Sequence, residues 1–333
     1  MDSLTQIVLG ASVAAVCVKP EHRRKAALVG AALGTLPDLD VLIDYGDAVS
    51  NFTYHRGFSH SLFVLIPFAV GVWWLLKQFW EPVKAAPRPW FYAVLLALAT
   101  HPLLDAHTVY GTQLLWPIPT PPVMWSTLFI IDPLYTLPLL VGMIAILARS
   151  TGRYAACLLS TGLVLSTLYL GWSWTAKAIV ENKVASALNG SGGRVLTTPA
   201  PFNTLVWRIL VVEDDTYKEG YYSVLAPNRP IEFTEHDKNL ALIKAADHLA
   251  AVDRLQWFSH GFIKGSMRQD YLVITDLRMG VEGSYVFNHA VASKPKEASK
   301  PTESFEPIVS RQLPQSFSGE DISRLWEQIK AMH

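Results

Sequence analysis

Long apolar runs with few charges fill the first half of this chain and most constrain its fold. Charged residues are sparse from about Leu4 to Thr175 and dense from Lys177 onward. A helix needs roughly 20 apolar residues, with a range of about 17–25, to cross the hydrocarbon core of a bilayer. We predict six membrane segments: 3–18, 26–40, 60–77, 90–107, 128–148 and 154–175. The first two are short, so we expect them to be tilted or to form a shallow hairpin.

The sequence after Lys177 has the pattern of a soluble domain. Spacing of apolar residues predicts a helix over 238–254, and β-branched and aromatic residues predict strands. The expected strands are 204–213, 217–226, 257–264, 270–276 and 283–289. Residues 293–320 are rich in Lys, Pro, Ser and Glu, which predicts a flexible tail over 293–333 that can end in a short helix over 319–331.

The predicted fold is therefore mainly α. A polytopic helical bundle spans 1–176, a soluble α+β domain spans 177–292, and the tail spans 293–333. The 28 basic and 28 acidic residues cancel, and no basic patch stands out, so nucleic acid is not an expected partner.

Loop charges predict the orientation in the membrane. Cytoplasmic loops carry an excess of Lys and Arg. Three alternate loops hold the cations: Lys19, Arg23, Arg24 and Lys25; Lys77, Lys84 and Arg88; Arg149 and Arg153. The opposite loops, 41–59 and 108–127, contain only Arg56. We therefore expect those two loops and the C-terminal domain on the outer, non-cytoplasmic side of the membrane.

Ionisable side chains at the ends of the apolar runs give the second constraint. Such groups are costly at membrane depth unless they are paired, solvated or bound to a metal. Three pairs fall on the predicted outer side: Asp38 and Asp40, His55 and His60, and His101 and Asp105. The last pair is four residues apart on a helix and shares one face. Because Asp and His are ligands of zinc, manganese or iron, the sequence predicts one convergent site for one or two divalent cations.

Each polar group alone has another explanation. Residues 37–40 fit a turn with an Asx cap, and the two loop histidines fit a polar surface. Asp132 precedes Pro133, which is typical of a helix N-cap before a first-turn proline. Gln6 fits either a supporting role at the site or core packing. His107 points away from the predicted ligand face and fits either the edge of the site or a position that faces water.

Four segments resemble a known family: Met1–Gln6, Pro37–Asp40, His55–Ser61 and His101–Asp105. They are similar to the bacterial inner-membrane metal-dependent hydrolases of the YdjM/YbcI type. The YfhP-like branch also has the patterns found here at 110–115, 131–135 and 276–280. The resemblance implies a metal-dependent hydrolase. Many members carry His where this chain has Gln6, so this chain is expected to have one ligand fewer if that His binds metal.

The expected function is a membrane-bound hydrolase with its site at the outer face. No Cys joins the cluster, so an open site that activates water is favoured over a closed structural one. Asp40 is expected to take the proton from that water. Arg56 suits a phosphate or carboxylate oxygen of the substrate, although pairing with Asp44 or Asp47 is an alternative. The site's depth favours a lipid or lipid-linked substrate, with a phosphoester preferred because of the guanidinium.

Two other classes remain open at this point. A divalent-metal transporter would need ligands near the midplane of the bilayer, whereas these lie at one face. A non-catalytic membrane module with a structural metal would use the same ligands without turnover.

Overall fold

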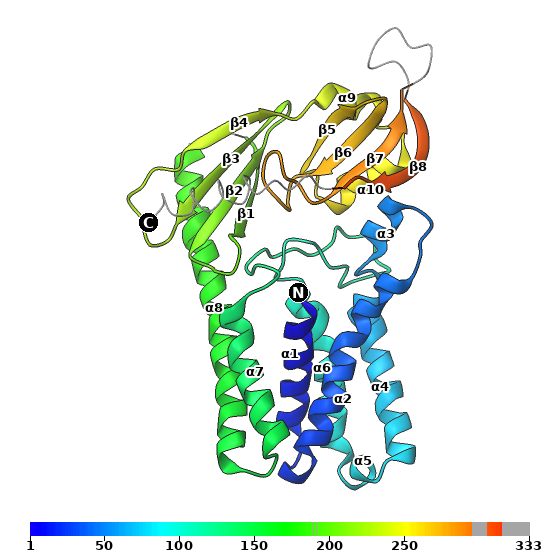
Figure 1. The fold of residues 1–333 in the computed structure, drawn as a ribbon, viewed down its shortest axis with the longest axis vertical. Helices are drawn as coiled ribbons and strands as arrows, with labels where there is room; N and C mark the ends of the chain where they lie inside the picture. The colour runs from blue at the N-terminus through cyan, green and yellow to red at the C-terminus, as the bar shows by residue number, and fades with distance from the viewer. Residues whose placement is uncertain (189, 191, 295–304, 315–333) are drawn as a thin grey trace. The chain divides into compact units, whose positions relative to one another are not determined.

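The computed structural model describes residues 1–188, 190, 192–294 and 305–314. The chain forms two compact units (Figure 1). The first, here called the helical unit, comprises Met1–Leu42, Arg56–Thr175 and Pro201–Thr204. The second, the β unit, comprises Ile43–His55, Ala176–Ala200 and the described residues from Leu205 onward.

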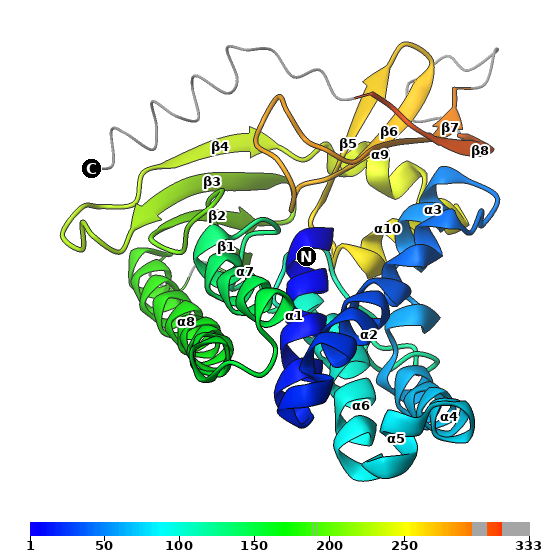
Figure 2. The same ribbon diagram turned by 60° about the horizontal axis from the view of Figure 1, so that its bottom comes forward.

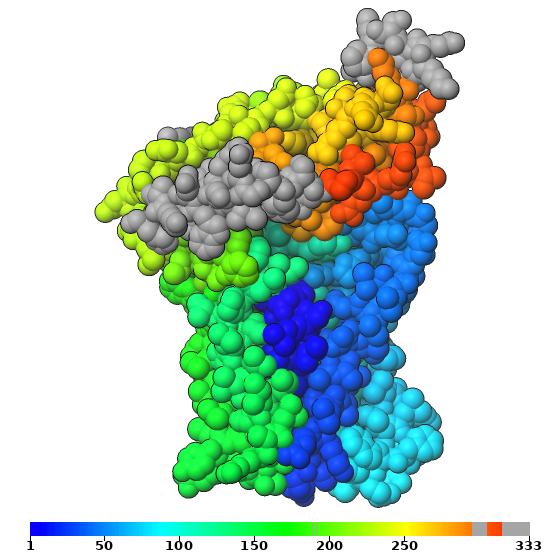
Figure 3. Space-filling model, in the orientation of Figure 1, coloured from blue at the N-terminus to red at the C-terminus, as the bar shows by residue number. Residues whose placement is uncertain are grey.

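Helices that run side by side make up the helical unit. Its longer helices are α1 (Ser3–Cys17), α2 (Arg23–Thr35), α4 (Leu62–Phe79), α6 (Pro87–Asp105), α7 (Pro133–Ala148) and α8 (Arg153–Leu188), of which α8 belongs to this unit only up to Thr175. Shorter pieces are α5 (Glu81–Ala85) and the 3₁₀ helices η1 (Pro20–His22), η2 (Leu36–Leu42) and η3 (Phe58–His60). Helix α1 packs against α2, α6 and α7, and Figure 2 shows it among them. Its first turns reach the surface between α7 and α2 (Figure 3), where Leu4 is exposed.

The N-terminal half is helical as predicted, but a bundle of six spans is not confirmed. Each predicted segment overlaps one of these longer helices. Among the described residues, only α4 and α8 are long and apolar enough to cross a membrane by length and composition. Helices α1 and α7 are apolar but have 15 and 16 residues, and α6 carries Arg88, His101 and Asp105.

Glycines let α1 and α2 cross at short range. A Cβ added at Gly30 would lie 2.2 Å from the carbonyl oxygen of Gly10 and 2.5 Å from the Cβ of Ala14. A Cβ at Gly34 would lie 2.7 Å from the carbonyl oxygen of Gln6. Small residues at these positions bring the two backbones together, and the ends of both helices carry parts of the site described below.

The β unit contains two four-stranded antiparallel sheets, ordered β1-β2-β3-β4 and β5-β6-β7-β8. The strands are β1 (Arg194–Pro199), β2 (Val206–Val212), β3 (Thr216–Ser223), β4 (Phe233–Asp237), β5 (Ile263–Arg268), β6 (Tyr271–Asp276), β7 (Asn288–Ser293) and β8 (Glu306–Gln312). Helices α3 (Ala48–Tyr54), α9 (Leu240–Ala245) and α10 (Ala250–Phe258) belong to the same unit. Every residue of β2 is buried, and its Trp207, Ile209 and Val211 pack on Ala176 and Val180 of α8.

Several boundaries in this unit differ from the prediction. The helix predicted over 238–254 is divided into α9 and α10. Ala246 and Leu249 lie between these two helices and are buried. The helical spacing of apolar residues therefore continues through a segment that is not helical. The strand predicted over 257–264 is largely wrong, because residues 257 and 258 finish α10 and positive φ angles at His260 and Gly261 then turn the chain. The strand predicted over 283–289 begins only at Asn288.

Part of the predicted tail is ordered, because residues 306–312 form β8 and pair with β7. Ile308 and Val309 are β-branched residues with a high strand propensity, a local signal that the average composition of the whole tail hides. The sequence prediction missed β1 and β4 as well. The short helix predicted over 319–331 lies outside the described residues.

Candidate metal centre

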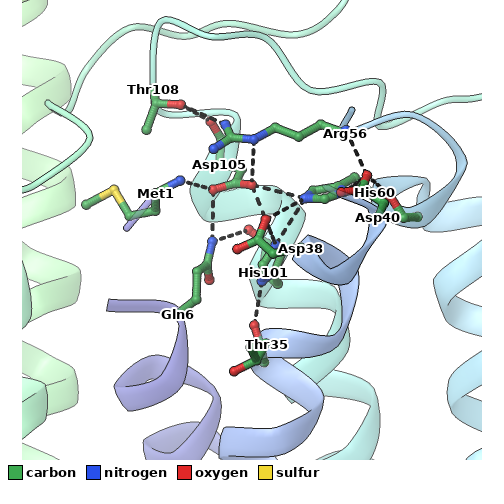
Figure 4. Close-up of polar contacts among 12 residues, drawn as sticks. Met1, Gln6, Thr35, Asp38, Asp40, Arg56, His60, His101, Asp105 and Thr108 are labelled. Atoms are coloured by element: carbon green, nitrogen blue, oxygen red, sulfur yellow. Dashed lines mark hydrogen bonds and ion pairs between the residues drawn. The ribbon is translucent and has the colours of Figure 1, made fainter. Parts of the chain in front are cut away.

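Two carboxylates and two imidazoles gather at one end of the helical unit (Figure 4). Asp38 comes from η2, His60 from η3, and His101 and Asp105 from the last two turns of α6. Their four ligand atoms all lie within 4.8 Å of one another. The side chains of His60, His101 and Asp105 are fully buried, and that of Asp38 is 21% exposed.

The His60 Nε2 atom is central to this group. It lies 3.1 Å from His101 Nε2, 3.2 Å from Asp105 Oδ2 and 3.4 Å from Asp38 Oδ1. His101 Nε2 lies 3.4 Å from the same oxygen of Asp38 and 3.6 Å from Asp105 Oδ2. A single cation among these atoms would therefore have two nitrogen and two oxygen neighbours.

The main chain fixes the tautomer of His101. Its Nδ1 lies 2.6 Å from the carbonyl oxygen of Gly34. A carbonyl oxygen only accepts hydrogen bonds, so Nδ1 carries the hydrogen and donates it. In the neutral ring, Nε2 then has a lone pair directed at the cluster, which is the form in which an imidazole binds a metal.

The fit to a cation follows from the donors and acceptors that meet here. The Oδ2 atom of Asp105 is buried and accepts no hydrogen bond from the residues described. If both imidazoles are neutral and carry their hydrogen on Nδ1, the cluster brings together four lone-pair atoms. A divalent cation would satisfy all four at once, whereas a hydrogen bond between any two of them would require a hydrogen on one of the Nε2 atoms.

Asp105 is also held from its other side. Its Oδ1 pairs with the amino group of Met1 and accepts a hydrogen bond of 2.9 Å from Gln6 Nε2. The same amide nitrogen donates to the carbonyl oxygen of His101 at 3.2 Å. Gln6 therefore supports two members of the cluster from outside it.

Arg56 lies beside the cluster rather than in it. Its Nε is 3.2 Å from Asp105 Oδ2, and one terminal nitrogen donates to Thr108 Oγ1 at 3.2 Å. The guanidinium also lies over the ring of Tyr110, with its carbon 4.9 Å from the centroid. In the described part of the chain, Arg56 forms its ion pair with Asp105 and not with Asp44 or Asp47, the alternative considered above. The backbone of Arg56 has φ +60°, a conformation that costs free energy in a residue with a Cβ.

The structure leaves two predicted ligands, Asp40 and His55, outside the group of four. Asp40 is buried and accepts hydrogen bonds from the backbone nitrogen of Arg56, at 3.0 Å, and from Ser59 Oγ. It lies on the Nδ1 side of His60, 3.7 Å from that nitrogen. His55 follows the last turn of α3 and belongs to the β unit.

His107 and Asp132 have structural partners. His107 Nδ1 contacts the carbonyl oxygen of Leu103 at 2.9 Å, and its Nε2 accepts from Trp174 Nε1 at 3.3 Å. Asp132 caps α7 by accepting from the backbone nitrogens of Leu134 and Tyr135, and it accepts from the Tyr169 hydroxyl at 2.9 Å.

Sequence reasoning missed Ser59, Thr108, the Gly34 carbonyl and the Met1 amino group. A main-chain group leaves no pattern in the residue types. The signal for Ser59 was its place in His55–Ser61, the most specific part of the resemblance.

Comparison with models of known protein families gives a match for this chain. The model of the YdjM inner membrane protein family matches residues 1–180, more than half of the 333 residues. The chain belongs to this family. The match contains every member of the centre, together with Arg56, Ser59 and Gln6. Comparisons with curated proteins and with solved structures give no match.

Proposed function

We propose that this YdjM-family protein is a membrane-bound, metal-dependent hydrolase. The observation that carries the proposal is the convergence of Asp38, His60, His101 and Asp105 within 4.8 Å, with the His101 lone pair turned inward. Mixed nitrogen and oxygen donors suit zinc or manganese, as one ion or two. Such an ion, when bound, acts as a Lewis acid and lowers the pKa of a bound water.

The residues around the cluster would divide the remaining work. Arg56 offers a positive charge next to Asp105, where it can hold a negatively charged substrate oxygen. The proton-accepting role predicted for Asp40 does not suit its place, because its side chain is 1% exposed and lies behind His60. We assign that role to the carboxylate of Asp38, the accessible member of the group.

A lipid or lipid-linked phosphoester is the substrate class we propose. The elements that supply the ligands also carry exposed apolar side chains: Leu39 at 49%, Val41 at 69%, Leu42 at 79% and Phe58 at 41%. Along η2, the carboxylates and these aliphatic groups alternate. Exposed apolar groups beside a polar site suit an amphiphile whose head group reaches the cation while its chains remain in the bilayer.

We further propose that the site faces the outer side of the inner membrane, with the β unit on that side. The support is the loop charge, with nine cations in three loops and only Arg56 in the opposite two. A cysteine placed at Ser50 should react with an impermeant maleimide in intact cells, whereas one at Lys25 should not. The reverse labelling would place the site in the cytoplasm.

A structural metal is the second candidate role. Three of the four side chains are fully buried, as in a site that holds elements together. Such a site would bind metal tightly and show no turnover of any ester.

Turnover by metal-loaded protein in lipid nanodiscs tests the hydrolase directly. We expect release of phosphate from phosphatidic acid, or of nitrophenol from a nitrophenyl phosphate, in the presence of zinc or manganese. His101→Ala should abolish it. Arg56→Gln should retain metal and lose about 100-fold in kcat/KM, as removal of one charge-stabilising donor does. Equal rates in wild type and His101→Ala would contradict the proposal.

A further inference from the structure

We infer that Asp40 and Ser59 form a hydrogen-bonded chain that fixes the tautomer of His60 and so presents its Nε2 to the centre. Both are positioning residues and act only through His60. The inference rests on the proposed function for the identity of the cation. The tautomer of His60 is a property of the protein whether or not a cation binds.

The direction of the chain follows from which atoms can donate. Ser59 Oγ contacts Asp40 Oδ2 and lies 2.9 Å from His60 Nδ1. An ionised carboxylate only accepts, so the single hydroxyl hydrogen of Ser59 points to Asp40. The hydroxyl oxygen must then accept from His60, which places the ring hydrogen on Nδ1. This leaves His60 Nε2 without a hydrogen in the neutral ring.

The alternative tautomer would be incompatible with a cation at this place. It would put a hydrogen on Nε2, which lies 3.2 Å from Asp105 Oδ2 and 3.1 Å from the His101 nitrogen. That hydrogen would occupy the position between the ligands and remove the lone pair that a cation needs. The chain therefore decides whether His60 is a ligand or a hydrogen-bond donor.

The two histidines are held by different kinds of group. His101 donates to the Gly34 carbonyl, a main-chain acceptor that no substitution removes. His60 depends on two side chains, Ser59 and Asp40. Substitution can therefore release one imidazole while the other keeps its orientation, which makes the inference testable.

Asp40 is itself held in place. The backbone nitrogen of Arg56 donates to its Oδ2 at 3.0 Å, and the residue is 4% exposed. The buried carboxylate thus accepts hydrogen bonds both from Arg56, two residues before η3, and from Ser59 inside η3. This explains how an acidic residue two positions from Asp38 can contribute to the centre without touching the cation.

The test uses the full chain in detergent micelles with ¹⁵N-labelled histidine, first without metal. Long-range proton–nitrogen spectra, recorded at alkaline pH where both rings are neutral, report the tautomer of each ring. We expect the Nδ1–H form for His60 in the wild type and in Ser59→Thr, which keeps the hydroxyl. Ser59→Ala and Asp40→Ala should shift His60 to a mixture or to the Nε2–H form, while His101 stays unchanged.

Zinc affinity gives the second readout. Loss of an orienting group costs about 10–100-fold in metal affinity, so Ser59→Ala should weaken zinc binding by that factor and Ser59→Thr should restore it. Ser61→Ala is the matched control, because this neighbouring hydroxyl donates to the Trp116 carbonyl and is outside the chain. If Asp40→Ala does not fold, the comparison of Ser59→Ala with Ser59→Thr tests the inference by itself.

An unchanged His60 tautomer together with unchanged zinc affinity in Ser59→Ala would overturn the inference. So would an equal loss of affinity in Ser61→Ala. A wild type that binds no zinc or manganese but keeps the Nδ1–H form of His60 would instead refute the proposed metal centre and leave the hydrogen-bonded chain standing.

Discussion

His60 and His101 face each other through Nε2 because the Nδ1 atom of each is held from behind. One is held by a serine hydroxyl and the other by a main-chain carbonyl. Neither contact follows from residue spacing. The pairing of His101 with Asp105 does follow, since positions four apart share a helical face.

The carboxylates of η2 show what the sequence could not decide. Asp38 and Asp40 are chemically alike and two positions apart. A 3₁₀ helix has about 3.0 residues per turn, so side chains two positions apart point in different directions. One enters the cluster and the other passes behind His60. The histidines at 55 and 60 are separated by Arg56, whose positive φ redirects the chain after α3.

Asp132 allows a residue-scale prediction that separates a cap from a ligand. Asp132→Ala removes the two N-cap hydrogen bonds of α7 and the contact with Tyr169. We expect a loss of about 1–2 kcal/mol in the free energy of unfolding and an unchanged metal content. Thermal unfolding and elemental analysis of the same preparation check this. A variant that loses its metal would show that Asp132 takes part in the centre.

At the scale of elements, the apolar runs predicted where the helices lie, but they did not predict where each helix ends. The segment predicted to stop at 175 continues as α8 to Leu188. Charges at Lys177, Glu181 and Lys183 led to the early stop. Ala176, Val180 and Val184 nevertheless keep helical spacing, and they pack on β2. The continuous apolar run in the sequence ends at the point where α8 changes from a helix that is apolar on all sides to an amphipathic one.

The α1–α2 crossing supports an element-scale prediction. Gly30→Ala places a Cβ within 2.5 Å of the Gly10 carbonyl and of Ala14, so the helices must separate. Overpacking of this kind costs about 1–3 kcal/mol, and a lower melting temperature is expected. Gly71→Ala on α4 is the matched control, because nothing lies within 4 Å of its added Cβ.

In an open helical position, Ala is favoured over Gly by about 0.5–1 kcal/mol. Gly71→Ala should therefore raise or maintain the melting temperature. Equal melting temperatures in the two variants would show that α1 and α2 do not depend on this close approach.

At the scale of the whole molecule, the sequence correctly divided a helical N-terminal half from a C-terminal part with β-sheets. It did not predict two separate sheets, nor that residues 43–55 fold with the β unit. Pairing between distant segments decides both features. Phe52 of α3 packs on Phe258 and Phe287, and contacts of that kind leave no local periodicity.

His289 makes the stability of the β unit depend on pH. Burial lowers the pKa of His289 to about 4, against smaller opposing effects of Asp276 and Asp47. The unfolded value is about 6.5, so the unfolded chain binds more protons between these two values. Stability is therefore lost as the pH falls through this window, by about 2 kcal/mol at pH 5 relative to pH 7.

Chemical unfolding of the full chain, followed through the β unit, measures this effect. His289→Phe keeps a ring beside Phe287 and should remove the loss, whereas His248→Phe, at an exposed position, should retain it. A wild type as stable at pH 5 as at pH 7 would contradict the role given to His289.

The metal content of the purified full-length protein tests the central claim most directly. After incubation with zinc or manganese and removal of excess ion, we predict one or two bound ions in the wild type and in His55→Ala. We predict little or none in His101→Ala and Asp105→Ala, provided circular dichroism shows that they remain folded. Equal metal in wild type and in both folded variants, or none in any of them, would contradict a metal centre at Asp38, His60, His101 and Asp105.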